Sequence, residues 1–332
     1  MFLFEAAPWY SYAMWFVVLG ALIGANELAR RSRTAALLMF VALPIALTLF
    51  VWPQTAGAGS STGTWFHWVK VYSALAGCLG FLWIRFHDGA AASKWWLLFP
   101  PAILSLNILE AVARDFQVYS MQVDGIVDGV HMISGPWNVM NGIAGLINIV
   151  TITGWLGIRL SRDRYRDMIW PDMIWPWIIA YDVWNFAYVY NCVGDHSFYA
   201  GLALLISCTI PTFLITKGTW LQARAQTLAC WMMFTMTVPA FVTDSPFAVK
   251  SSHNPTALLT VSALALVINV AVLVLHIYRM RVTGVNPRRG HEIYRGVAAA
   301  DEVAANAGPA LALGELPAPD DASALAAHPT HR

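Results

Sequence analysis

The chain of 332 residues contains nine long apolar stretches, and this repetition limits its possible folds more than any other feature. One helix needs roughly 20 apolar residues to cross a hydrocarbon core about 30 Å thick. The stretches of about this length are residues 10–29, 34–52, 65–84, 95–113, 137–158, 172–192, 197–216, 227–243 and 256–278. We therefore predict an all-α, polytopic integral membrane helix bundle with nine transmembrane helices.

The composition leaves little room for a soluble catalytic domain. Hydrophobic residues make up 58% of the chain and charged residues 12%, whereas soluble domains contain about 45–50% apolar and about 25% charged residues. We expect one transmembrane domain over residues 1–296. The segment 297–332 is rich in Ala, Pro and Asp and has low hydrophobicity, which is typical of disorder. We predict that this segment is a disordered cytoplasmic tail.

Lys and Arg lie almost entirely in every second gap between the apolar stretches. Arg30 follows the first stretch, Arg162 follows the fifth, and Lys217 and Arg224 are assigned to the gap after the seventh. The alternate gaps hold mainly acidic residues such as Asp115. Because short loops rich in Lys and Arg stay in the cytoplasm, we expect the N-terminus outside the membrane and the C-terminus inside. An odd number of helices is needed for this alternation to close.

Ionisable residues inside a membrane-spanning stretch are costly and are therefore candidates for function. Asp182 lies near the middle of the sixth stretch, and Asn185 lies one turn further on the same helix face. The pair could bind a cation or carry a proton, and it could instead form a hydrogen-bonded clamp between helices. If the pair is functional, Asp182→Asn abolishes any pH-linked or cation-linked activity while the protein still folds.

The fourth stretch carries a similar polar pattern near its outer end. Asn107, Glu110 and Arg114 follow each other at spacings of three and four residues. Glu110 and Arg114 can form an ion pair across one turn. These residues either belong to a functional site or mark the membrane interface, where water is close.

Three asparagines fall on one stripe of the fifth stretch. Asn138, Asn141 and Asn148 lie beside Gly142 and Gly145. Small residues let helices approach closely, and amide side chains form hydrogen bonds between helices. We favour this role in helix pairing over a role in ligand binding.

His67 and Lys70 begin the third helix at the outer side, at a depth similar to that of the polar groups above. Faces of the third to sixth helices could therefore line a cavity open to the outside. The candidate binding residues are Asp182, Asn185, Glu110, Asn107, Asn138, Asn141, Lys70 and His67.

A metal site has weaker support. Asp124, Asp128 and His131 follow a spacing that would place them on one face of a helix, and Asp and His side chains bind Zn²⁺. However, Gly125 and Gly129 weaken a helix in this region. We favour a solvated acidic loop, and we expect neither a metal nor a cofactor.

The run WIIAYDVWNFAYVYNCVGDHSFYAGLALLISCTIPTFL at residues 177–214 resembles a family of uncharacterised bacterial multi-pass membrane proteins. The similarity extends over the apolar core, roughly residues 10–280. The resemblance implies a bacterial inner membrane. It implies no substrate, so no catalytic residue can be assigned from it.

Three functions remain open from the sequence. The first is a transporter or solute-binding protein that uses Asp182 and Asn185, with the lipid bilayer and a cation or small polar solute as partners. The second is an intramembrane enzyme for a lipid or isoprenoid, with Asp182 or Glu110 as general acid or base and His67 or His131 nearby. The third is a non-catalytic sensor or scaffold that uses its basic cytoplasmic face. Nucleic acid is not an expected partner.

Overall fold

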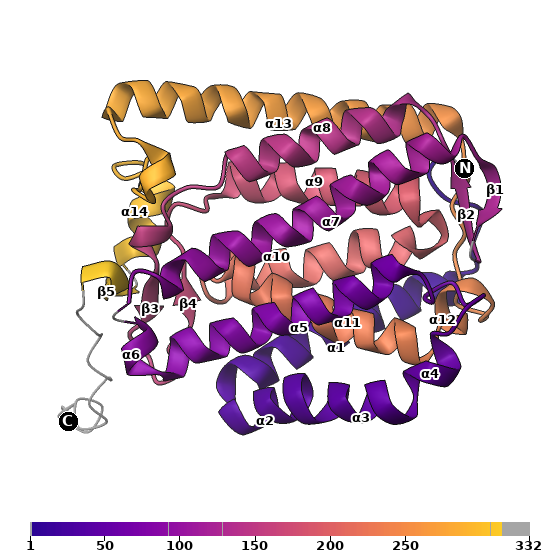
Figure 1. The fold of residues 1–332 in the computed structure, drawn as a ribbon, viewed down its shortest axis with the longest axis horizontal. Coiled ribbons are helices and arrows are strands. Elements are labelled where there is room, and N and C mark those ends of the chain that lie inside the picture. Colours follow the sequence, from indigo (N-terminus) through magenta and orange to yellow (C-terminus); the bar gives the residue numbers. More distant parts are fainter. Residues whose placement is uncertain (1, 92, 128, 306, 314–332) are drawn as a thin grey trace, which may run out of the picture.

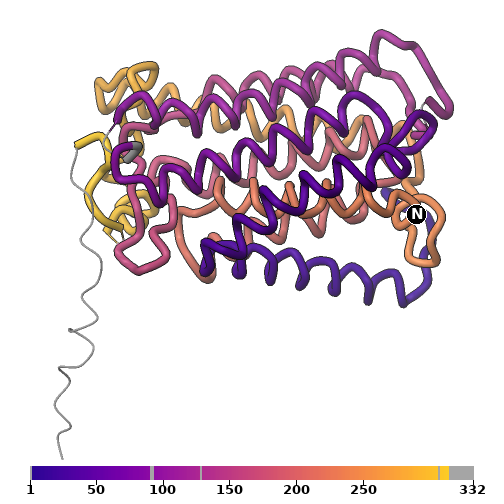
Figure 2. The backbone as a smooth tube through the Cα atoms, turned by 60° about the horizontal axis from the view of Figure 1, so that its bottom comes forward, coloured from indigo at the N-terminus to yellow at the C-terminus, as the bar shows by residue number. Residues whose placement is uncertain are grey.

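The protein is a bundle of long helices that run side by side along the molecule, with loops gathered at its two ends (Figure 1). The structure is a computed structural model that describes residues 2–91, 93–127, 129–305 and 307–313. The N-terminus lies at one end of the bundle, and the last described residues lie at the other end (Figures 1 and 2). We call these the N-terminal end and the C-terminal end. The predicted all-α class is confirmed.

The long helical segments correspond in position to the nine apolar stretches. They are α1 (Trp9–Arg31), α2 (Arg33–Leu37) continued by η1 (Leu38–Ala42) and α3 (Leu43–Phe50), α5 (Trp65–Phe86), α7 (Phe99–Met121), α8 (Pro136–Val150), α9 (Trp175–Cys192), η5 (Ser197–Ala203) continued by α10 (Leu204–Leu214), α11 (Trp220–Thr237) and α13 (Pro255–Thr283). Short helical turns are α4 (Trp52–Thr55), α6 (Asp88–Ala91), η2 (Trp96–Leu98), η3 (Trp155–Gly157), η4 (Gly194–His196), α12 (Ala240–Thr243), η6 (Pro287–Arg289), α14 (Ala298–Ala305) and η7 (Leu311–Leu313).

Six helices of the described chain are long and apolar enough to cross a membrane. They are Trp9–Arg31, Arg33–Phe50, Trp65–Phe86, Trp96–Met121, Gly194–Leu214 and Pro255–Thr283. Helices α8, α9 and α11 are not in this set. Helix α8 has only 15 residues, which gives a length of about 22 Å. Helix α11 carries Gln222, Arg224 and Gln226 in its first two turns, and all three side chains are buried. Helices enclosed by others contact little lipid and tolerate such polar residues.

The helices around the centre of the bundle pack closely. Helix α8 contacts α7 and α13, and α5 contacts α7 and α11. A Cβ atom at Gly145 of α8 would lie 2.5 Å from Val112 Cγ2 of α7 and 2.8 Å from Trp184 Nε1 of α9. The predicted close approach of helices at this glycine is confirmed. In contrast, α1 and the α2–α3 segment lie at the side of the bundle and leave most of their apolar residues exposed.

At the C-terminal end, a small three-stranded sheet joins distant parts of the chain. Strand β3 (Arg159–Ser161) pairs antiparallel with β4 (Met168–Ile169) and with β5 (Ala307–Ala310). The Asp172 carboxylate accepts hydrogen bonds from the backbone N–H groups of Ile293 (3.2 Å) and Tyr294 (2.8 Å).

The structure therefore differs from the predicted disorder over residues 298–305 and 307–313, which form α14, β5 and η7. Composition alone missed this order because the backbone pairing partners lie more than a hundred residues earlier in the chain. Residues 314–332 lie outside the described part of the chain.

At the N-terminal end, strands β1 (Asp124–Val127) and β2 (Val130–Ile133) form a hairpin. Asp124 and His131 do not share a helical face: they lie on paired strands, where Asp124 Oδ1 is 3.6 Å from His131 Nε2. Asp128 lies outside the described residues. Gly125 and Gly129 have φ angles of +157° and +74°, which favour a turn over a helix.

Candidate functional site

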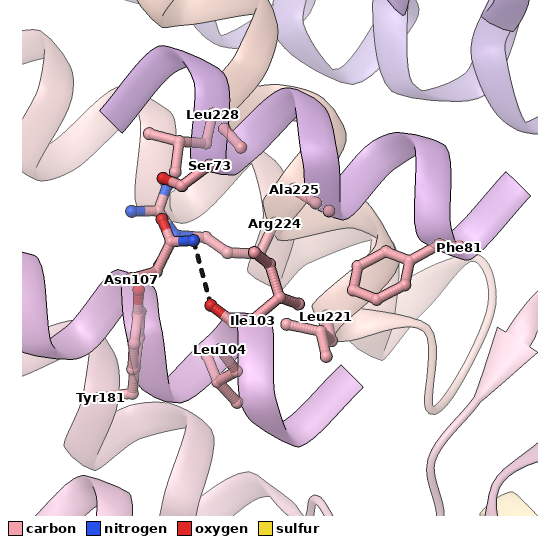
Figure 3. Close-up of a pocket in the computed structure, with 12 residues that line it drawn as sticks. Ser73, Phe81, Ile103, Leu104, Asn107, Tyr181, Leu221, Arg224, Ala225 and Leu228 are labelled. Atoms are coloured by element: carbon pink, nitrogen blue, oxygen red, sulfur yellow. Dashed lines mark hydrogen bonds between the residues drawn. The ribbon is translucent and has the colours of Figure 1, made fainter. Parts of the chain in front are cut away.

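Two adjoining cavities lie inside the bundle. Helices α5, α9 and α11 line both, η5 and α10 add to the lining of the first, and α7 adds to the lining of the second. The first has a volume of about 50 Å³, and its lining includes His67, Lys70, Asn185, Tyr188, His196 and Arg224. We call it the histidine cavity. The second has a volume of about 30 Å³, and its lining includes Ser73, Asn107, Tyr181 and Arg224 (Figure 3). We call it the asparagine cavity. Each exceeds the roughly 10–15 Å³ needed to hold a water molecule.

Arg224 lines both cavities and joins them. It lies one turn into α11, and its side chain is only 5% exposed. In Figure 3 the side chain extends toward Asn107 and Ser73. Arg224 Nη2 donates a hydrogen bond to Asn185 Oδ1 at 3.3 Å, and Nε donates one to Tyr181 Oη at 3.4 Å. Both bonds are long and both acceptors are neutral.

The guanidinium of Arg224 has no direct counter-charge in the described chain: Asp182 is near enough to attract it electrostatically, but the two groups form no ion pair. Its Nη1 atom is buried without a hydrogen-bond partner. It forms no ion pair with any described carboxylate. Its remaining contact is with the ring of Tyr181, whose centroid lies 5.8 Å from the Arg224 Cζ. A buried charge without a partner is strongly unfavourable, so this arrangement needs an explanation.

Lys70, the other cation of the histidine cavity, is fully compensated. Its Nζ lies 2.8 Å from Glu110 Oε2 and donates to the backbone oxygen of Asn107 at 2.7 Å. Ser73 Oγ also donates to Glu110 Oε2, at 3.2 Å. The predicted ion pair between Glu110 and Arg114 is therefore wrong: Glu110 faces α5 instead. The described residues lining the two cavities include Lys70 and Arg224 but no Asp or Glu. After Glu110 neutralises Lys70, one positive charge remains.

Neutral polar groups surround the N-terminal side of the histidine cavity. The rings of His67 and His196 lie 5.8 Å apart between centroids. His67 Nδ1 is 2.8 Å from Thr64 Oγ1, whereas His196 Nε2 and Tyr188 Oη are buried without a hydrogen-bond partner. Buried polar groups are almost always hydrogen-bonded, so these atoms, like Arg224 Nη1, indicate room for a polar guest.

Asp182 and Asn185 do not form one site. Thr209 Oγ1 of α10 donates to Asp182 Oδ2 at 2.7 Å, and Trp220 Nε1 of α11 donates to the same hydroxyl at 3.2 Å. Asp182 therefore links α9 to α10 and α11, and it lines neither cavity. Asn185 instead accepts the hydrogen bond from Arg224.

Asn138 and Asn141 belong to a separate cluster around Asp115. Asn141 Nδ2 donates to Asp115 Oδ2 at 2.8 Å, and Asn138 Nδ2 lies 3.4 Å from Oδ1. Cys192 Sγ donates to the same Oδ1 at 3.3 Å. The cluster joins α7, α8 and α9. Across the described part of the chain, no group of three or more His, Cys, Asp or Glu side chains is placed to hold a metal ion.

A family model described as a family of unknown function (DUF5692) matches residues 5–306. The chain belongs to this family. The predicted membership of an uncharacterised family is confirmed. No curated protein and no solved structure matches the chain.

The sequence interpretation missed Arg224, Asp115 and His196 as members of buried sites. Arg224 was placed in a loop because the apolar stretch begins only at residue 227, but α11 begins at Trp220. Asp115 was placed in an outer gap, whereas α7 continues to Met121. A signal for Arg224 existed: residues 227–243 give a rather short spanning helix, and an earlier start brings the arginine inside.

Proposed function

We propose that this protein lies in a bacterial inner membrane and crosses the bilayer nine times, with its N-terminus outside and its C-terminus inside. The alternation of basic loops supports this orientation. The N-terminal residues and the last described residues lie at opposite ends of the bundle, which is consistent with an odd number of crossings (Figure 1). The six long apolar helices would contact most of the lipid, and α8, α9 and α11 would be the more enclosed crossings.

We propose further that the protein is a transporter or solute-binding protein for a small anion, which binds in the histidine and asparagine cavities. The observation that carries this proposal is the buried Arg224 guanidinium, which adjoins both cavities and has no carboxylate partner in the described chain. An uncompensated charge in this setting costs several kcal/mol. A bound anion would remove that cost.

The chemistry of the lining favours a carboxylate or phosphate over the cation expected from the sequence. A guanidinium binds either oxyanion through two parallel N–H···O bonds. His196 Nε2 and Tyr188 Oη could each form a hydrogen bond with the solute. A cation would face a net positive charge in the cavity, with no lining carboxylate among the described residues to bind it.

The experiment is thermal unfolding of the detergent-purified protein with acetate, succinate and phosphate, each compared with chloride at equal ionic strength. A ligand at 100 times its Kd stabilises the folded state by about 2.7 kcal/mol. We expect one or more oxyanions to stabilise wild type but not Arg224→Gln. The matched control is Arg281→Gln, because Arg281 is exposed in the last turn of α13.

Equal stabilisation of wild type and Arg224→Gln by every anion would contradict the proposal. Stabilisation by cations alone, abolished by Asp182→Asn, would return the site to the one expected from the sequence. Uptake of the stabilising anion into proteoliposomes, measured in parallel, would separate transport from binding without transport.

A further inference from the structure

An open groove on the side of the bundle offers a second binding site, which shares no lining residue with the two cavities. It has a volume of about 710 Å³ and lies between α7 and α13 at the C-terminal end. The groove exists because α8 ends at Val150, while α13 continues to Thr283 and α7 begins at Phe99. The chain after α8 turns away from the helical direction and leaves the two neighbours uncovered.

The walls of the groove are mostly apolar. Leu98 and Pro101 line one side, Val150 lies at the end of α8, and Leu273 and Ile277 line the side made by α13. The volume falls within the range of about 300–1,000 Å³ that is usual for binding pockets. The flanking helices α7 and α13 are both candidate membrane spans, so the groove would open toward lipid in the proposed membrane arrangement.

Besides Ser105, the groove is lined by an arginine and a histidine, which distinguish it from an ordinary lipid-facing surface. Arg288, just beyond α13, lines the groove and is exposed. Its guanidinium has no hydrogen bond or ion pair with the described residues, whereas Arg279 on α13 donates to the backbone oxygens of Ile293 and Arg295. His276 also lines the groove and is only 3% exposed, and its Nδ1 has no hydrogen-bond partner. The groove thus pairs a free cation at its rim with an unsatisfied polar atom in its wall.

We propose that this groove binds one anionic phospholipid, with an acyl chain along the apolar walls and the phosphate against Arg288. His276 Nδ1 would form a hydrogen bond with a polar group of the bound lipid. Basic pockets between helices on the cytoplasmic side of a membrane commonly hold such headgroups. The proposed orientation places the groove in the cytoplasmic leaflet. The assignment does not depend on anion binding at Arg224.

The test compares phosphatidylglycerol with phosphatidylcholine, each added to the full-length protein in detergent, and measures bound lipid by native mass spectrometry. We expect phosphatidylglycerol to bind more tightly, and Arg288→Gln to weaken that binding about tenfold through loss of one charge-assisted contact. Arg289→Gln is the matched control, because Arg289 is the adjacent exposed arginine and is not part of the lining. It should bind like wild type.

A second pair of variants tests the acyl-chain half of the site. Ala102 is an exposed residue of α7 that lines the groove, and Leu106 is an exposed residue one turn further on that does not. Ala102→Phe should abolish the preference for phosphatidylglycerol, whereas Leu106→Phe should retain it.

The proposal would be overturned if Arg288→Gln and Arg289→Gln weakened phosphatidylglycerol binding equally, or if wild type bound the two lipids equally. Competition by inorganic phosphate alone would also overturn it, because the site would then bind a free anion.

Discussion

Two buried arginine clusters in this protein are built on opposite principles. At the C-terminal end, Asp167 Oδ2 accepts a hydrogen bond from Arg30 Nη1 at 2.7 Å, and Asp167 Oδ1 lies 3.4 Å from Arg85 Nη2. Arg85 also donates to the backbone oxygens of Arg30 and Tyr165. At the cavities, Arg224 contacts only neutral partners, through bonds of 3.3 and 3.4 Å.

The difference lies in charge compensation rather than in the number of hydrogen bonds. Arg85 also has one unpartnered atom, Nη1, but a fully buried carboxylate adjoins its guanidinium. Arg30 and Arg85 share the Asp167 carboxylate. Arg224 forms no ion pair with a described carboxylate, and neither does the buried Arg114, which donates to Gln117 and Met132. Of these two, only Arg224 lines the cavities. We infer that a bound solute completes the second cluster.

The largest expected effect is at Asp167. Asp167→Asn removes the carboxylate between Arg30 and Arg85 and leaves two buried guanidinium groups without it. Breaking a buried ion pair from one side costs about 3–5 kcal/mol, so the free energy of unfolding should fall by about that amount. Asp88→Asn is the control, because Asp88 pairs with Arg166 at an exposed position, where such pairs contribute less than about 1 kcal/mol. If Asp167→Asn and Asp88→Asn lowered the free energy of unfolding by similar amounts, the Asp167 carboxylate would not be a structural counter-charge for Arg30 and Arg85.

A much smaller effect is expected for Arg224→Gln in the absence of added oxyanions. The substitution removes an uncompensated charge, and glutamine can still donate a hydrogen bond to Asn185 or Tyr181. The free energy of unfolding should change by less than about 1 kcal/mol, or rise. Chemical unfolding of wild type, Arg224→Gln and Asp167→Asn side by side would measure these free energies. A loss as large as that of Asp167→Asn would mean that Arg224 is a structural residue.

The smallest effect is expected at Asp182. Asp182→Asn keeps an acceptor for the Thr209 hydroxyl, so stability should change by less than about 1 kcal/mol, the usual worth of one hydrogen bond. Stabilisation by anions should persist, because Asp182 lines neither cavity. Anion titrations of this variant would decide whether the binding site lies at Arg224 or at Asp182. Loss of the response would make Asp182, as expected from the sequence, part of the site after all.

The sequence predicted the helices well and their partners poorly. Each apolar stretch corresponds to a helical segment, because burial and lipid both select apolar residues of helical length. Glu110 was paired with Arg114 by local spacing, but the contact is made with Lys70 of another helix. Which faces of α5 and α7 meet depends on packing between distant segments, and one sequence carries no direct record of it.

Several candidate residues were nevertheless brought together. Lys70, His67 and Asn185 line the histidine cavity, and Asn107 lines the adjoining one. Their identification followed from the cost of placing polar groups inside a membrane. Arg224 escaped because polar residues at the start of α11 look the same in sequence whether they lie in a loop or in an enclosed helix.

The most direct test of the central claim supplies the missing counter-charge from within the chain. Leu228 lines both cavities and lies one turn after Arg224 on α11, so Leu228→Asp would place a carboxylate beside the guanidinium. Leu228→Asn is its neutral match. Without added anions, we predict that the free energy of unfolding of Leu228→Asp is about 1–3 kcal/mol higher than that of Leu228→Asn. An Asp variant less stable than the Asn variant would show that Arg224 needs no counter-charge, and would contradict the account.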